Sequence, residues 1–247
     1  MIKLKYNSGQ IILLALLLLS FLCFNSLNHT PSNTVIKTDK PLTLNPNIAR
    51  IISLGAPKLV SSYLWMLTML QSDIDHTKED RSWMFYRFKA ISSLDPYFFE
   101  NYLYGGLYLS IIKNDLRGAE DIYNEGLKFY PSSLDLLWNA GFNLCFELKE
   151  CPKAIPYFTK LINLDTDMRF KIASSILSKI HIKEENKKLG FMILYTSYQK
   201  MPDGQLKERV EKNLYELKKE IDYECFKGNE TSCEDFDFFG KRYNFSK

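Results

Sequence analysis

Apolar residues recur at helical spacing through most of this chain. From residue 58 to residue 202 they fall at i, i+3 and i+4 positions, and the short alternating runs typical of strands are absent. Short polar turns divide this region into four units of two helices each. The pattern predicts an all-α fold, with helices at 58–75 and 81–94, 97–113 and 117–129, 134–148 and 152–163, and 168–181 and 186–199.

These units share a period of 35 residues. An aromatic residue recurs at Phe88, Tyr123 and Phe158, and a glycine recurs at Gly106 and Gly141. A fixed period of 20 to 50 residues is typical of helical solenoids. Two further pairs of identical residues are also 35 positions apart: Pro96 and Pro131, and Ala119 and Ala154.

The glycines need an explanation, because a glycine inside a helix costs roughly 1 kcal/mol relative to alanine. Gly105 and Gly106 stand in the middle of one expected helix. Small residues let two crossing helices approach closely. We therefore expect Gly106 to lie opposite Ala119, and Gly141 opposite Ala154, where the two helices of a unit cross.

A further amphipathic helix is expected after the four units, over residues 203–224. Such a helix covers the apolar face that the last repeat of an array would otherwise expose. Residues 225–247 then form a C-terminal tail. The apolar positions of the helix make a single stripe: Leu206, Val210, Leu214, Leu217 and Ile221.

The N-terminus carries an uninterrupted apolar run of 14 residues at 11–24. Extended to residues 9–27, the run approaches the length of about 20 residues that a membrane-spanning helix needs. Lys3 and Lys5 precede it. Because positive flanks stay in the cytoplasm, we expect a single-pass protein of the inner (plasma) membrane, with its N-terminus cytoplasmic and the remainder extracytoplasmic (periplasmic).

A retained signal anchor at 1–27 is favoured over a cleaved signal peptide, because no small-x-small cleavage pair follows the run. Lipid attachment at Cys23 is the third alternative, against which the bulky Leu22 argues. Residues 28–47 are rich in Thr, Asn and Pro and have no period, so they are expected to be a linker. The repeat domain is then residues 48–202.

Four cysteines follow the anchor, and they can pair in three ways. Pairing of sequence neighbours, Cys145–Cys151 and Cys225–Cys233, is the most economical. Bridges of this kind fit an exported domain. Small buried thiols in a reduced cytoplasmic protein are the alternative.

A helical hairpin of about 34 residues with small residues at the helix crossing and a terminal proline resembles the tetratricopeptide repeat. The resemblance covers about residues 58–202 and implies a right-handed superhelical solenoid of about four hairpins, whose concave face binds peptides or protein segments. The sequence departs from the family pattern in its period of 35, which places one extra residue in the turn between the two helices. The first and fourth units also lack the Gly/Ala pair. The matching residues are Trp138, Gly141, Ala154 and Phe158 in the third unit, and Leu103, Gly106, Ala119, Tyr123 and Pro131 in the second.

The resemblance implies a groove lined by the first helix of each unit. On that register, the residues expected to contact a partner are Asn101, Tyr104, Tyr108, Asn139 and Asn143. Tyr and Asn are adaptable contact residues. The alternative is that they are ordinary residues of a helix face.

Composition offers little sign of catalysis. The net charge of +3 is spread along the chain, and no dense basic face suggests nucleic-acid binding. The three histidines, His29, His76 and His181, have no partner at metal-ligand spacing. We therefore expect no metal, no cofactor and no small-molecule substrate.

The sequence thus predicts a membrane-anchored, non-enzymatic scaffold that binds another protein in a bacterial-type cell-envelope complex. An alternative is an accessory subunit or enzyme in which the helices frame an unrecognised site around Cys145 or His181. A scaffold that faces the cytoplasm is a third alternative.

Overall fold

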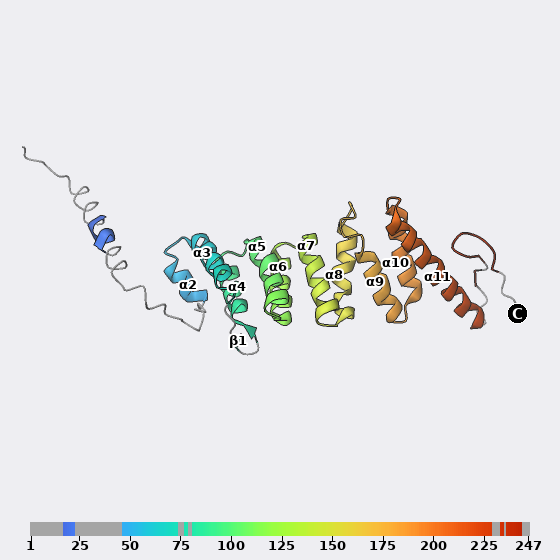
Figure 1. The fold of residues 1–247 in the computed structure, drawn as a ribbon, viewed down its shortest axis with the longest axis horizontal. Coiled ribbons are helices and arrows are strands. Elements are labelled where there is room, and N and C mark those ends of the chain that lie inside the picture. The colour runs from blue at the N-terminus through green and yellow to red at the C-terminus, as the bar shows by residue number, and fades with distance from the viewer. Residues whose placement is uncertain are drawn as a thin grey trace, which may run out of the picture. The chain divides into compact units, whose positions relative to one another are not determined.

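The computed structural model describes residues 17–22, 46–73, 77–78, 81–228, 233–234 and 236–243. The chain divides into two compact units, Met1–Lys40 and Pro41–Lys247. Residues 17–22 are the described part of the first unit, and they are helical. The described part of the second unit is helical apart from one short hairpin of two strands and an isolated bridge in the tail (Figure 1).

Within the residues described, no helix has both the length and the apolar character needed to cross a membrane. The predicted anchor at 1–27 lies outside the described residues except for 17–22. The predicted linker at 28–47 also lies outside them, except for its last two residues.

The helices of the second unit from α3 (Pro57–Leu70) onwards pack mainly against their neighbours in sequence, whereas α2 (Pro46–Ile52) packs mainly against α4 (Trp83–Leu94). The short helix α2 comes first, and α11 (Gln205–Lys227) packs on the last hairpin. The all-helical fold predicted from the apolar spacing is confirmed. The hairpins between α2 and α11 are α3 (Pro57–Leu70) with α4 (Trp83–Leu94), α5 (Phe99–Leu107) with α6 (Leu116–Phe129), α7 (Leu134–Phe142) with α8 (Cys151–Leu164), and α9 (Ala173–Lys183) with α10 (Lys187–Lys200).

Four local features differ from the sequence prediction. The helix expected over residues 58–75 ends at Leu70. Helix α2 begins at Pro46, inside the expected linker, and a hairpin of β1 (Thr77–Lys78) and β2 (Arg81–Ser82) precedes α4. Helix α9 begins five residues later than expected. The reason is Asp165, whose carboxylate accepts hydrogen bonds from the backbone N–H groups of Arg169 at 2.8 Å and Phe170 at 2.7 Å and holds a turn there.

Gly105 and Gly106 lie between two aromatic rings. A Cβ atom on Gly106 would lie 2.2 Å from the ring of Tyr123, which belongs to the second helix of the same hairpin. A Cβ atom on Gly105 would lie 3.1 Å from the ring of Phe88, which belongs to the preceding hairpin. Both rings are fully buried. The glycine pair therefore lets α6 of the same hairpin and α4 of the preceding hairpin both pack closely against α5.

The third hairpin repeats half of this arrangement. A Cβ atom on Gly141 would lie 3.0 Å from the buried ring of Phe158. The expected crossings of Gly106 with Ala119 and of Gly141 with Ala154 are thus corrected. Both alanines are buried, but the closest side chain to each glycine is the aromatic residue 17 positions further along the chain. The glycines make room for rings rather than for a close backbone crossing.

In the second and third hairpins, the first helix ends in a π-helical turn. Helix α5 continues as η1 (Tyr108–Ile112) and α7 continues as η2 (Asn143–Glu147), 35 residues later. The backbone N–H of Lys113 donates to the carbonyl five residues earlier at 3.0 Å, and Leu148 makes the equivalent bond at 2.9 Å. A π turn accommodates one inserted residue within a helix. It accounts for the period of 35, so the extra residue lies at the end of the first helix and not in the turn that follows.

Contacts between hairpins span about one period. The Tyr130 hydroxyl donates to the Tyr97 carbonyl at 2.7 Å, and the Tyr157 hydroxyl donates to Asn124 at 2.6 Å. Exposed ion pairs contribute little free energy individually. We infer that they mainly set the alignment of one hairpin against the next. Ion pairs with about this separation include Arg81–Asp115, Lys89–Glu125, Arg117–Glu150 and Arg169–Asp135 between hairpins, and Lys187–Glu220 between the last hairpin and α11.

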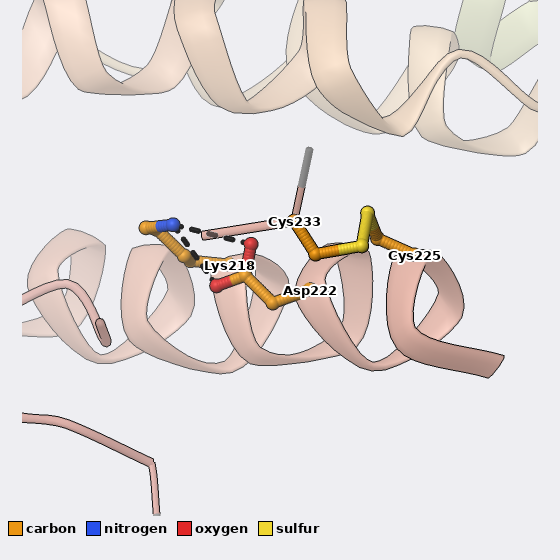
Figure 2. The surroundings of a disulfide bond; sticks show 4 residues. All are labelled: Lys218, Asp222, Cys225 and Cys233. Atoms are coloured by element: carbon orange, nitrogen blue, oxygen red, sulfur yellow. Dashed lines mark hydrogen bonds and ion pairs between the residues drawn. A yellow bond between two sulfur atoms is a disulfide. The ribbon is translucent and has the colours of Figure 1, made fainter. Parts of the chain in front are cut away.

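The C-terminal tail folds back on α11. A disulfide joins Cys225 near the end of that helix to Cys233 in the tail. Figure 2 shows this bridge beside Lys218 and Asp222 of the same helix. The Lys218 ammonium donates to Asp222 at 2.9 Å and to Glu234 of the tail at 2.6 Å. The bridge and the ion pairs together hold the tail against the helix.

We expect Gly106→Ala to destabilise the protein. The added methyl would overlap a fully buried ring, and overpacking of this kind costs about 1–3 kcal/mol. The better helix propensity of alanine returns roughly 1 kcal/mol, so the clash decides the sign. Thermal unfolding of the full chain in detergent measures the effect. Gly141→Ala, with a wider 3.0 Å approach, is the graded control and should cost less; an unchanged midpoint for Gly106→Ala would contradict the packing argument.

The attachment of the tail should depend on pH. The hydrogen bond from Lys218 lowers the pKa of Glu234 below its ordinary value. Because the folded-state pKa is depressed, the stabilisation is present above the ordinary glutamate pKa of about 4.3 and is lost as pH falls through the folded value. Hydrogen exchange of residues 236–243, corrected for its intrinsic pH dependence, should accelerate in that acidic range. Glu234→Gln should remove this response, whereas Glu216→Gln on the exposed side of α11 should leave it intact.

Candidate partner-binding groove

A largely apolar groove of about 540 Å³ lies between the first helices of the third and fourth hairpins. One wall is formed by α7 and η2, and the other by α9 and the residue that precedes it. Phe142 and Phe146 stand on the first wall and are 38% and 37% exposed. Ile172 and Ile176 face them from the second wall. The groove therefore offers aromatic and aliphatic side chains to solvent.

Spacing along the helix builds the aromatic wall. Trp138, Phe142 and Phe146 are four residues apart, so they share one face of a helix. Their rings are in contact, with centroids 6.0 Å apart for the first pair and 4.8 Å for the second. Trp138 also stacks on Phe170 at 5.2 Å. Packing on both sides fixes the first ring, while the outer two remain half open to solvent.

A disulfide forms part of the lining of the groove. Cys145 in η2 is joined to Cys151 at the start of α8, which is the pairing proposed from the sequence. Between them, Lys149 adopts a left-handed backbone conformation with φ 60°. The bridge holds the π turn against the next helix and so fixes the direction of the aromatic wall.

Positive charges predominate at the rim. Lys149, Lys179 and Lys183 border the groove against a single acidic residue, Glu184. The three lysines are all exposed. A partner segment with apolar side chains and acidic flanks would complement both the walls and the rim.

Two of the predicted contact residues lie in the interior instead. Asn101 is fully buried, and its amide donates to the Phe88 carbonyl at 3.1 Å and to the Ser92 hydroxyl at 2.9 Å. Asn143 is 2% exposed, and its amide donates to the Leu116 carbonyl at 2.9 Å. Both side chains satisfy polar groups inside the fold, so their placement in a groove is corrected.

The other three predicted contact residues remain predictions. Tyr104 is 49% exposed on α5, and Tyr108 is partly buried in η1. Asn139 is also partly buried and donates to the Asp135 carbonyl of its own helix at 2.8 Å. None of the three lines the groove between α7 and α9.

The sequence prediction missed Phe142, Phe146, Ile172 and Ile176. A signal for the phenylalanines was present, since α7 and η2 are apolar on more faces than a helix packed on one side requires. The register implied by the repeat resemblance predicted tyrosine and asparagine residues as contacts instead.

A second hollow, of about 440 Å³, lies between α8, α9 and α10. His181 lines it together with Lys171 and Lys200. The residues described contain no cluster of three His, Cys, Asp or Glu side chains suited to a metal ion. Cys145, the other residue considered for a catalytic site, is held in its disulfide and has no free thiol in this structure.

No protein-family model matches this chain, and no curated protein sequence matches it. The assignment of a function therefore rests on the surfaces of the helices themselves.

Proposed function

We propose that this chain is a membrane-anchored, non-enzymatic scaffold built of tetratricopeptide-like repeats. In this proposal, the hairpins form a right-handed solenoid, and the groove between α7 and α9 binds a segment of another protein in the cell envelope. The observation that carries the proposal is the half-exposed aromatic wall, Phe142 and Phe146, bordered by lysines.

The distribution of exposed apolar residues supports a binding role for the first helices. On α4, α6 and α8, the second helices of three hairpins, the exposed large apolar residues are limited to Phe129 and Leu164 at helix ends. The corresponding first helices expose more, whereas in the fourth hairpin the second helix, α10, exposes Met192 and Tyr195 and α9 exposes no large apolar residue. Contiguous exposed apolar surface is typical of interaction sites. The exposed large apolar residues of these first helices and their π turns are Leu59, Tyr63, Met66, Leu70, Tyr104, Ile111, Ile112, Phe142 and Phe146.

The repeated packing supports the solenoid. The ring-on-glycine contact and the π turn each recur after 35 residues. Repeats that contact only their neighbours are the defining property of a solenoid, and α11 with the tail would be the polar end that such an array needs.

Two properties of the chain support the proposed compartment. The apolar run with its preceding lysines favours a retained anchor with the hairpins outside the cytoplasm. The two disulfides favour an oxidising compartment such as the periplasm.

Site-specific crosslinking in intact cells tests the groove. A photo-crosslinking amino acid placed at Phe146 should give one discrete protein adduct. The same residue placed at Met192 serves as a control, because that side chain is 62% exposed but lines the second hollow. Lys179→Glu combined with Lys183→Glu should reduce the adduct at position 146 several-fold, because the reversed charges repel an acidic segment.

Absence of any adduct at position 146 would contradict the binding groove. The same adducts at positions 146 and 192 would show non-specific capture and would also contradict it. An adduct that survives the charge reversal unchanged would keep the scaffold but remove the acidic character of the partner.

A further inference from the structure

Helix α3 carries large apolar side chains on its exposed side as well as on its buried side. Its 14 residues, PKLVSSYLWMLTML, include one charged side chain, Lys58 at the start. Ser61, Leu64 and Thr68 are buried on the inner side. The apolar face of a helix is normally buried, yet the large apolar side chains on the outer side of this one are exposed in the described structure.

The outer side of α3 forms one continuous stripe. Its four residues are spaced by four, three and four positions, which places them on a single face of the helix. They span about 16 Å at the helical rise of 1.5 Å per residue. The residues and their exposed fractions are Leu59, 71%; Tyr63, 55%; Met66, 49%; and Leu70, 72%.

The turn before α3 adds further apolar surface. Leu54 is 93% exposed and has a φ of 47°, in the left-handed region that favours glycine. Ile48 and Ile51 of α2 are 53% and 76% exposed. An exposed leucine in an unfavourable backbone conformation would be explained if its side chain contacted another surface.

The charge of this region differs from that of the rest of the chain. Between residues 40 and 72 there is no acidic residue, but there are three basic ones, Lys40, Arg50 and Lys58. Residues 1–39 carry a further net charge of +2, and residues 73–247 carry a net charge of −2, so the positive charge of the chain is concentrated in its first 72 residues. Apolar side chains combined with positive charge match the surface of a bilayer that contains anionic lipids.

The sequence keeps this region within reach of a membrane. The apolar run at 11–24 ends 21 residues before α2 begins. A chain of that length extends over about 70 Å at most. The surface can therefore touch the same bilayer that the apolar run is proposed to enter.

We propose that the outer face of α3 and the turn at Leu54 lie on the surface of an anionic bilayer. The apolar side chains enter the interfacial layer, with Tyr63 at the level of the headgroups, where tyrosine is enriched. This contact holds the first hairpin on the membrane and restricts the orientation of the hairpins that follow. It requires no bound protein partner, so it can fail or succeed independently of the groove.

Lipid quenching in reconstituted vesicles tests the proposal. The full chain carrying Cys23→Ser, with its other cysteines in the two bridges, is labelled with an environment-sensitive fluorophore at Leu70→Cys or at Ile111→Cys. These two positions are equally exposed, at 72%, but lie on different helices. In vesicles of phosphatidylglycerol and phosphatidylcholine, brominated lipid should quench the label at position 70 several-fold more than the label at position 111. Leu59→Ser combined with Met66→Ser should lower the quenching at position 70 while the thermal midpoint is unchanged.

Equal quenching at positions 70 and 111 would overturn the proposal, since it would mean either no contact or contact of the whole array. Shielding of position 70 from water without quenching by lipid, rising with protein density in the vesicles, would also overturn it. That result would assign the face to contact between copies of the chain.

Discussion

The contact of a buried aromatic ring with a helical glycine is the constraint on which the rest of the structure depends. Tyr123 on Gly106 and Phe158 on Gly141 set how closely the two helices of a hairpin approach. Phe88 on Gly105 does the same between hairpins. Because each contact leaves no room for a Cβ atom without rearrangement, the positions of α5 and α7 relative to their neighbours are fixed by packing. This packing therefore also sets the directions in which the residues at the ends of these helices point.

The π turns at the ends of these helices expose apolar side chains. In both η1 and η2 an apolar residue points outward, Ile111 in the first and Phe146 at the equivalent position in the second. π turns are frequent at functional sites because the inserted residue redirects the side chains around it. In the third hairpin a disulfide also holds the turn to α8. The wall of the groove is thus supported by covalent bonding on one side and by ring packing on the other.

The sequence predicted the elements that depend on local pattern and missed those that depend on contacts across the fold. The period, the helices and the all-helical class follow from apolar spacing and were recovered. Asn101 and Asn143 were misplaced, because an amide that is hydrogen-bonded in the interior has the same one-dimensional signature as one on a surface. Helix α2 and the β1–β2 hairpin were missed because each is too short to show a period. The period of 35 indicated an extra residue in each unit, but its position in a π turn depends on backbone hydrogen bonds that the sequence pattern does not show.

The two ends of the array differ in a way that bears on the membrane. At the C-terminal end, α11 and the tail cover the last hairpin, and Phe238 of the tail packs against Phe191, Tyr195 and Tyr198 of α10. At the other end, the seven-residue α2 contacts the first hairpin and leaves the outer face of α3 bare. An array of repeats has the same need for cover at both ends. Since the uncovered end is also the end that follows the apolar N-terminal run and carries the excess positive charge, the proposed lipid contact would satisfy that need without a further protein element.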